Sequence, residues 1–583
     1  MTNREIAKEF TEMAALLEMQ GVAFKPRAYE KAALSIESLD REAKDIYKEG
    51  GIQALEQIPG VGKGIAGHIE ELIRKGSFHE YKMLKKKFPV NISELLAVEG
   101  IGPHMIKVLW EKLRIKNLTQ LEAAATKGRI RDLPHFGLKS EQKILKGIEF
   151  LKASGGRPVL GFMLSEIRSL EKMIESFDSV EKAIAVGSVI RRRETIGDID
   201  ILVMSSKPAY VIERFLALPH IAHVYGKGET KTNVRLKNGL DADLLVVPKK
   251  SFGAAFNYFV GSKYHNIALR EVAMKKAMKL SDQGLFRGNK MIAGETEEGI
   301  YHALGFKQVP PPEIRENTGE LQAAKLGKLP HLIGYGDLRG DLQVQTNWTD
   351  GKNSIEEMAH AAQQMGLEYI VITDHTRSLA MTGGADEKKL LKQMEEIKKI
   401  QKKFHGFRIL AGAEVNISKD GSLDIDDKTL AKLDVVGAAV HSHFNISRQE
   451  ETKRIIRAME NPHVDIIFHL TGRMINKRKP IEINIDEIIA AAKRTKTVLE
   501  IDAYPDRLDI KDEYIRKCVD AGVKMSIDSD AHATQHFQYL EMGIAQARRG
   551  WAEKKDIINA WPVEKMLTML KQGQKSKLTI DVF

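Results

Sequence analysis

Three patterns of hydrophobic and polar positions follow one another along the chain. Up to about residue 155, apolar residues recur every three or four positions, as in IAKEFTEMAALLEMQ, which predicts short helices separated by glycine-bearing turns. Between about 156 and 318, β-rich runs such as KAIAVGS, DIDILVM, TNVRL and LDADLLVVP lie among helical stretches, which predicts an α+β domain. Between about 338 and 575, runs such as YIVIT, RILAGAEV, VVGAAVH and VLEID alternate with helical segments, which predicts a parallel α/β barrel-like domain.

These changes of pattern predict a multidomain protein, as does the length of 583 residues, because one core rarely serves more than about 250–300 residues. The stretch Val309–Leu332 is rich in Pro and Gly and has no sustained period, which predicts a linker. The expected divisions are helical domains over 1–90 and 91–155, an α+β domain over 156–318, a linker over 319–337 and a barrel-like domain over 338–575.

Charge and cysteine content narrow the classes of partner and compartment. The net charge of +11 suits a polyanionic partner such as nucleic acid, although a basic, well-solvated surface would give the same value. Cys518 is the only cysteine, which excludes an intrachain disulfide and a multi-thiolate zinc site and fits a reducing cytosol. No apolar window is long enough for a membrane span, and the N-terminus lacks a signal-peptide core, so we expect a soluble intracellular protein with no membrane partner.

The string GDIDILV carries the most informative chemistry. Asp198 and Asp200 are two apart, so in a strand they project to the same face. A Gly187-Ser188 turn precedes them, and Asp243 lies in a later strand candidate, ADLLVVP. Three convergent carboxylates can hold two Mg2+ ions for nucleotidyl transfer. An isolated Asp-x-Asp pair could instead lie on a surface edge, but the Gly-Ser turn and the third aspartate favour the metal site.

Two Gly-x-Gly turns between helices mark the N-terminal region, in IPGVGKGIA and VEGIGPHMI, with a weaker third example in LPHFGLKS. Such a turn lets N–H groups at a helix N-terminus face a phosphate. A single turn of this kind is more often a packing turn, but a tandem pair in a basic chain favours contact with a DNA backbone. The candidate DNA-binding residues are Gly60, Gly62, Lys63, Gly64, Gly100, Gly102 and Lys107.

A second set of polar residues follows the apolar runs of the C-terminal domain. A lone strand-end histidine is more often a satisfied polar group than a ligand, but a series at successive strand ends predicts a cluster of metal ions that could cut a phosphodiester. Imidazole mixed with carboxylate suits Mn2+, Zn2+ or Fe2+. The members of the series are His375, Glu414, His441, His469, Asp530 and His532.

Taken together, the tandem hairpins, the aspartates and the C-terminal series resemble the bacterial form of the family X DNA polymerases, which adds a polymerase-and-histidinol-phosphatase (PHP) domain. The resemblance implies helix-hairpin-helix domains, a nucleotidyltransferase palm and thumb, and a PHP domain of 3'-5' exonuclease type. It implies two Mg2+ ions on Asp198, Asp200 and Asp243, and Mn2+ or Zn2+ in the PHP domain, with Asp350 as a further ligand. The implied nucleotide-binding residues are Gly187, Ser188, Arg191, Gly197, Tyr258, Phe259, Gly261, Ser262, Asn266 and Arg270.

On this resemblance we expect a monomer that fills short gaps in DNA repair, using gapped or primed DNA and dNTPs, in the cytoplasm at the nucleoid. Two other functions remain open: a protein that is mainly a metal-dependent 3'-end nuclease or phosphoesterase, and a noncatalytic DNA-binding scaffold. The intact aspartate set argues against a scaffold, since binding alone would not require a cluster of mutually repelling carboxylates.

The sequence also departs from the family pattern. An aromatic residue, two arginines and a glycine usually follow Gly-Ser, but here the run begins Val189-Ile190. The PHP motif Asp-Leu-His-x-His has Gln343 and Gln345 at its histidine positions, and Asn416 replaces an aspartate. An amide oxygen binds transition metals more weakly than an imidazole, so we expect reduced or no nuclease activity. His68 stands where polymerase beta has a Schiff-base lysine, so we expect no lyase activity at that position.

Overall fold

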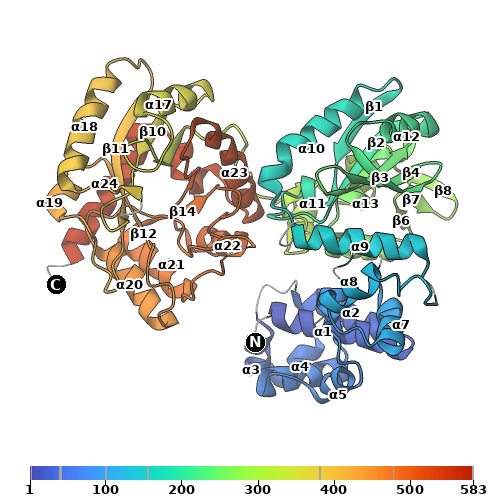
Figure 1. Cartoon of the computed structure of the whole chain (residues 1–583). Coiled ribbons are helices and arrows are strands. Elements are labelled where there is room, and N and C mark those ends of the chain that lie inside the picture. Colours follow the sequence, from blue (N-terminus) through green and yellow to red (C-terminus); the bar gives the residue numbers. More distant parts are fainter. Residues whose placement is uncertain are drawn as a thin grey trace.

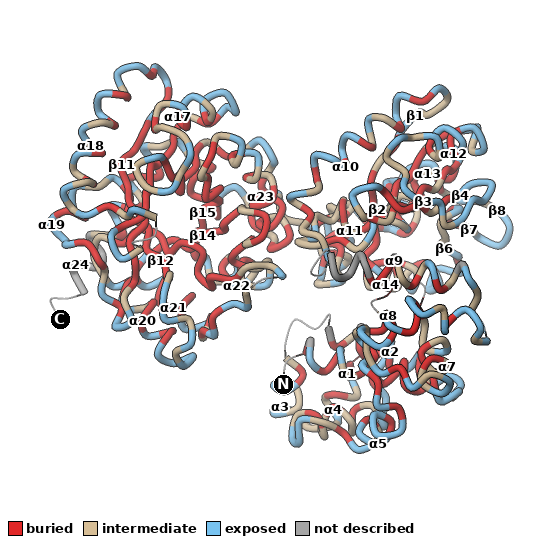
Figure 2. The backbone as a smooth tube through the Cα atoms, in the orientation of Figure 1, coloured by how far each residue is buried: buried red, intermediate tan, exposed pale blue. Residues whose placement is uncertain are grey.

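The structure is a computed structural model, and it describes the chain except for residues 2, 38–41, 59, 97, 99–100, 135, 154–156, 380–381, 477 and 581–583. Figure 1 shows the barrel domain beside the α+β domain, with the N-terminal helices below the latter. The buried backbone is concentrated in the strands of the two large sheets and in the N-terminal helices (Figure 2). Within the described residues, every helix is too short or too polar to cross a lipid bilayer.

The N-terminal region is helical, and its helices share one cluster of buried residues that runs from Ile6 to Ile148. Phe10 packs edge-on against Tyr29 and Phe78, with ring centroids 5.3 and 5.8 Å apart. The helices are α1 (Asn3–Gln20), α2 (Lys25–Glu37), α3 (Ala43–Glu56), α4 (Lys63–Lys75), α5 (His79–Lys87), α6 (Ile92–Leu96), α7 (Pro103–Leu113), α8 (Leu118–Thr126) and α9 (Leu138–Ala153).

The α+β domain is a mixed sheet with strand order β1-β2-β5-β4-β3. Strands β2 and β5 are parallel, and the other neighbouring strands are antiparallel. Ile199 and Leu244 face the core under α10, so the alternating aspartates of β2 and β5 lie on the opposite face. The elements are α10 (Leu160–Glu175), β1 (Val180–Ala185), α11 (Gly187–Ile190), β2 (Asp198–Ser205), α12 (Pro208–Leu216), β3 (Ile221–Lys227), β4 (Lys231–Leu236) and β5 (Asp241–Val247).

A smaller unit follows, made of α13 (Phe252–Val260), α14 (Lys263–Lys275), β6 (Lys279–Ser281), β7 (Gly284–Arg287), β8 (Lys290–Ala293), α15 (Glu297–Ala303) and α16 (Glu320–Leu326). Helix α16 lies inside the segment predicted as a linker. It buries Ala324 in the same cluster as Tyr301, and the Glu320 carboxylate lies 2.6 Å from His265 Nδ1. The prediction of a bare linker was therefore wrong for this stretch, because a two-turn helix between glycines is too short to show a period.

The C-terminal domain is a parallel sheet with strand order β15-β14-β13-β12-β11-β10-β9. The backbone N–H of Gln345 donates to the Ala531 carbonyl at 2.8 Å, which links the two ends of the sheet and nearly closes a barrel, as the alternating pattern predicts. The elements are β9 (Gly340–Val344), α17 (Ile355–Gln364), β10 (Tyr369–Ile372), α18 (Glu387–Gln401), β11 (Arg408–Asn416), α19 (Asp427–Leu430), β12 (Val435–Ala439), α20 (Arg448–Glu460), β13 (Ile466–Ile467), α21 (Ile485–Thr495), β14 (Val498–Asp502), α22 (Asp512–Ala521), β15 (Met525–Asp528), α23 (Leu540–Arg549) and α24 (Val563–Ile580).

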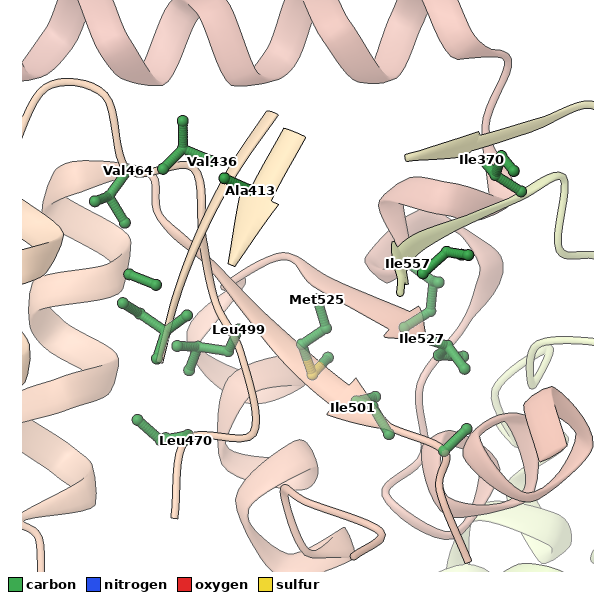
Figure 3. Close-up of a cluster of buried hydrophobic side chains, with 14 of the residues drawn as sticks. Ile370, Ala413, Val436, Val464, Leu470, Leu499, Ile501, Met525, Ile527 and Ile557 are labelled. Carbon is green, nitrogen blue, oxygen red and sulfur yellow. The ribbon is translucent and has the colours of Figure 1, made fainter. Parts of the chain in front are cut away.

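The two faces of the barrel strands belong to different hydrophobic clusters. Residues such as Ile370 and Ile501 pack with the surrounding helices (Figure 3). Alternate residues such as Tyr369 and Phe468 pack with α24. A Cβ on Gly437 would lie 1.9 Å from the Phe468 ring, so this strand position needs glycine. Because apolar side chains cover both faces of the strands, the polar residues lie at the carboxyl ends of the strands.

Candidate functional site

Register places the aspartates of the α+β domain side by side. Asp198 pairs with Asp241, and Asp200 pairs with Asp243, across the parallel strands β2 and β5. The two candidates on β5 differ in their partners. Arg235 binds Asp241 through two nitrogens, at 2.5 and 3.0 Å. This bidentate pair occupies Asp241 and leaves Asp243 as the β5 carboxylate beside Asp200.

Asp243 lies beside a neutral donor and a cation from β4. Asn233 Nδ2 donates to its Oδ1 at 2.5 Å, and Lys231 Nζ lies 2.8 Å from its Oδ2. The spacing of residues in the sequence did not single out Lys231 or Asn233. The pairing of β4 with β5 places Asn233 opposite Asp243. These contacts therefore depend on the register of two strands, which no sequence motif reveals.

The Gly-Ser turn lies directly against Asp200. Gly187 has φ +61°, and a Cβ there would lie 2.7 Å from Asp200 Oδ2, so the close approach requires glycine. The Val186 N–H donates to the Asp200 carbonyl at 2.8 Å. Burial, together with the charges of Asp198 and Asp243, raises the pKa of Asp200 to about 6. A divalent cation would relieve this repulsion, so the donor set fits such an ion.

The predicted nucleotide-binding residues lie around this turn. Arg191 Nη1 donates to the Val260 carbonyl and lies 3.0 Å from where a Cβ on Gly261 would stand. Asn266 Nδ2 donates to the Tyr258 carbonyl at 2.6 Å, and Arg270 Nε donates to the Asn266 carbonyl at 3.1 Å. Arg191 thus joins the Gly-Ser turn to the segment that contains Tyr258, Phe259, Gly261 and Ser262.

Two further arginines follow Arg191, and both are paired with glutamates. Arg192 Nη2 lies 3.2 Å from Glu541 of the barrel domain, and Arg193 Nη1 lies 3.4 Å from Glu316. These ion pairs with Glu541 and Glu316 give both arginines partners within the protein.

In the N-terminal hairpins, glycines precede two helices. Gly62 caps α4 and Gly102 caps α7, and a Cβ on Gly62, Gly64 or Gly102 would meet nothing within 4 Å. Lys63 at the start of α4 is exposed, and Lys107 is half-buried in α7. Gly60 has φ +82°, so this turn position needs glycine. The predicted residue Gly100 lies outside the described residues.

His68, at the position of the polymerase beta lysine, is part of a packed aromatic group. Its Nδ1 lies 2.7 Å from the Tyr29 hydroxyl, and its ring stacks on Phe78 with centroids 4.5 Å apart. Burial lowers the pKa of His68 below its ordinary value. These contacts give His68 a structural role.

In the barrel domain, Glu414 lies at the centre of the predicted ligand series. Its carboxylate oxygens lie 3.2 Å from His375 Nδ1, 3.0 Å from His441 Nε2 and 2.8 Å from His469 Nε2. Burial acts to raise the pKa of Glu414, but these imidazoles hold it well below its usual range. The side chain is therefore a buried carboxylate that faces three imidazole nitrogens.

Two groups among the described residues have the spacing of a metal site. One is Asp350 with His375 and His532, and the other is His375 with Glu414 and His441. Buried polar atoms near them have no hydrogen-bond partner among the described residues, namely His469 Nδ1, Glu500 Oε1 and Asp530 Oδ1. Such atoms fit a site that binds divalent cations.

The side chains of the two glutamines point at Glu414. Gln343 Nε2 and Gln345 Nε2 donate to Glu414 Oε2 at 3.2 and 2.9 Å, and both side chains are fully buried. Asn416 Oδ1 lies 2.7 Å from His441 Nδ1. The two glutamine amides thus donate to the same oxygen of Glu414.

The chain was compared with known proteins. Family models match it as a helix-hairpin-helix domain (residues 1–78), a SAM-like helix-hairpin-helix tandem (92–149), a DNA polymerase beta thumb (255–316) and a PHP domain (341–562). It is 34% identical to the DNA polymerase/3'-5' exonuclease PolX of Bacillus subtilis (strain 168) over 578 residues, which cover 98% of this chain and 100% of that protein.

The chain belongs to the PolX family of DNA polymerases.

The barrel domain of this PolX protein also resembles shorter proteins. It is 35% identical to a probable phosphatase of Thermoanaerobacter sp. (strain X514) over 233 residues, or 38% of this chain and 90% of that protein. A probable phosphatase of Caldanaerobacter subterraneus is 34% identical over 190 residues, or 31% of this chain and 70% of that protein. We call the barrel the PHP domain and the unit from α13 to α16 the thumb, because residues 341–562 and 255–316 match those family models. For the α+β domain we use the name palm.

The PHP domain of this PolX protein contains a positively charged side chain, Arg507, that the sequence analysis did not single out. Arg507 Nε lies 3.5 Å from both Asp502 Oδ2 and Asp530 Oδ2. Burial acts to lower the pKa of Arg507, but Asp530 and Asp502 raise it above its ordinary value. No spacing rule connects Arg507 to the strand ends, because it lies in the connection after β14.

Proposed function

We propose that this protein is a DNA-directed DNA polymerase that fills short gaps during DNA repair. The main support is the carboxylate set on β2 and β5 behind the Gly187-Ser188 turn, in a chain related along its whole length to a PolX polymerase. Asp198, Asp200 and Asp243 would hold two Mg2+ ions. When bound, such ions supply the charge that activates a primer 3'-hydroxyl and stabilises leaving pyrophosphate.

The remaining roles are those that the resemblance to the family implies. Ser188 and Arg191 would bind the triphosphate, with Gly197 beside it. Tyr258, Phe259, Gly261 and Ser262 would form the wall against the sugar, where a backbone turn and an aromatic face would exclude a ribose 2'-hydroxyl. Asn266 and Arg270 would contact the nucleotide and the template side. The primer oxygen forms a bond to the α phosphorus as the bond to pyrophosphate breaks.

The hairpins would hold gapped or primed DNA through backbone N–H groups and lysines, without reading sequence. We expect the protein to act as a monomer in the cytoplasm at the nucleoid. The proposed domain limits are those given by the sequence, except that α16 belongs to the thumb.

The function is tested by single-nucleotide extension on a one-nucleotide gap with Mg2+. We expect incorporation of the templated dNTP, and loss of incorporation on chelation of the metal. A wild-type protein that binds gapped DNA in a salt-dependent manner but adds no nucleotide would contradict the polymerase proposal and support the scaffold.

A second activity, 3'-5' exonuclease, belongs to the PHP site. The Glu414 cluster favours binding of Mn2+ or Zn2+ there, whereas Gln343 and Gln345 take the places of two imidazole ligands. We propose that the ligands are Asp350, His375, Glu414, His441, His469, Asp530 and His532, and that the site cuts 3' ends slowly or not at all.

A negative charge at the first hairpin is expected to weaken DNA binding. Gly64 is exposed at the start of α4, and a side chain there would meet no neighbour. Gly64→Glu should therefore weaken binding to gapped DNA by about 3- to 10-fold at low salt, through repulsion of phosphate at a helix N-terminus. Gly67→Glu, one turn further along α4 and also free of neighbours, is the matched control. Equal fluorescence anisotropy titrations for both variants would contradict a phosphate contact at this turn.

A further inference from the structure

The connection between the Gly-Ser turn and β2 lies against the PHP domain. Arg473 Nη2 and Nη1 lie 2.5 and 3.2 Å from the two carboxylate oxygens of Glu194, and Gln546 Nε2 donates to the same carboxylate at 3.0 Å. Arg473 is buried. A bidentate arginine–carboxylate pair fixes direction as well as distance. Glu194, four residues before Asp198, is thus held in one orientation by the PHP domain.

Two other contacts hold the flanks of the same connection. Glu541 Oε1 on α23 accepts from Arg192 at 3.2 Å and from Arg168 at 2.5 Å. Asn476 Nδ2 donates to the Arg157 carbonyl at 2.7 Å. The Arg157 guanidinium in turn lies 2.8 Å from where a Cβ on Gly197 would stand. The PHP domain therefore contacts the connection next to the turn directly, and it reaches the end next to β2 through Arg157.

These polar contacts surround a shared apolar core. Leu508 and Met542 of the PHP domain are buried in the same cluster as Leu160 of the palm. A Cβ on Gly161 would lie 2.6 Å from Pro505, so α10 packs directly against the PHP domain. Figure 1 shows this meeting of α10 and α11 with α23. A core of this kind holds the two domains in one arrangement.

On the PHP side, the anchor belongs to the framework of the metal-site candidates. Arg473 also donates to the Leu508 carbonyl, next to Arg507. Asp509 accepts from the N–H and the hydroxyl of Thr471, both at 2.9 Å, and Thr471 is two residues after His469. Arg473, the partner of Glu194, is therefore held in a network of hydrogen bonds within the PHP domain.

We propose that the PHP domain positions the triphosphate-binding turn of the palm, with Glu194 and Arg473 as the main positioning residues; this rests on the proposed polymerase function. Helix α11 has a single turn, Gly187–Ile190, which cannot keep its shape alone. Three consecutive arginines follow it, and their repulsion needs the carboxylates that face them. Glu541 and Glu316 supply those charges, so that Ser188 and Arg191 meet a triphosphate in a fixed geometry.

The test uses Glu194→Gln and Glu541→Gln in the full-length protein, with extension of gapped DNA as the assay. We expect KM for the dNTP to rise about 5- to 10-fold and kcat to change by less than about twofold, because the substitutions disturb positioning rather than the carboxylates. Glu313→Gln is the matched control. It removes an ion pair between the thumb and the PHP domain, with Arg548 Nε at 2.8 Å, that does not touch the turn. Its KM should remain that of the wild type.

Direct binding separates positioning from chemistry. With a dideoxy-terminated primer, Glu194→Gln and Glu541→Gln should weaken dNTP binding by the same factor as KM, and Arg473→Lys should weaken it less than Arg473→Gln. The inference is overturned if wild-type protein incorporates nucleotides and folded Glu541→Gln and Glu194→Gln bind dNTP as tightly as wild type; if Glu194→Gln fails to fold, Glu541→Gln decides. If wild-type protein itself incorporates no nucleotide, the polymerase proposal has failed instead.

Discussion

Asp200→Asn is expected to lower the rate of single-nucleotide gap filling by about 1,000-fold, equivalent to about 4 kcal/mol of transition-state stabilisation. The amide keeps the shape of the side chain but loses the charge that a divalent cation needs. Asp243→Asn and Asp198→Ala should show losses of similar size. The rate is measured by rapid quench on gapped DNA with saturating dNTP.

The matched control is Asp241→Asn. Asp241 is on the same strand and the same face as Asp243, but Arg235 holds its carboxylate. This variant should lose stability and keep most of its activity. Asp200→Asn should melt no lower than wild type at neutral pH. The pKa of Asp200 is raised to about 6, so its charged form disfavours the folded state above that pH, and the amide removes this cost. Equal activity losses at positions 200 and 241 would refute the assignment of the metal carboxylates.

The second large effect is a gain of activity. The double change Gln343→His and Gln345→His is expected to raise Mn2+-dependent degradation of a primer 3' end by about 10- to 100-fold, because imidazole nitrogen binds transition metals more tightly than an amide. Both positions face Glu414 and are fully buried, so the new rings would lie beside His375 and His469. The Mn2+ content per chain, measured by mass spectrometry of the metal, should rise with the activity.

Adding Glu414→Gln to this double variant should abolish the gained degradation while gap filling continues. That comparison separates the PHP site from the palm and from a contaminating nuclease. If the unaltered protein already degrades primers fully and Glu414→Ala abolishes the degradation, the proposal of a weakened PHP site is wrong. Arg507 offers a physical reason for a weakened site, because its charge already neutralises Asp502 and Asp530.

Local sequence patterns predicted much of the fold and of the candidate site. The spacing of Asp198 and Asp200 placed them on one face, because strand periodicity is a property of neighbouring residues. The barrel followed from alternating strands and helices, and its strand-end polar residues from the direction of parallel strands. The linker prediction failed at α16, since Ala324 is buried by thumb residues distant in sequence. A seven-residue helix leaves too short a pattern to recognise.

The sequence by itself determined the succession of domains and the spacing of the aspartates, because both depend on residue identity and local pattern. The sequence also contains Gln343 and Gln345, but only the resemblance to the PHP motif marks them as replacements for histidine. Only the tertiary structure decided which partners those residues have. Arg235 forms an ion pair with Asp241, and Lys231 forms one with Asp243, because β4 pairs with β5. Glu194 and Arg473 are 279 residues apart and meet only because the palm packs on the PHP domain. Contacts of that kind depend on how whole domains pack, which no local pattern records.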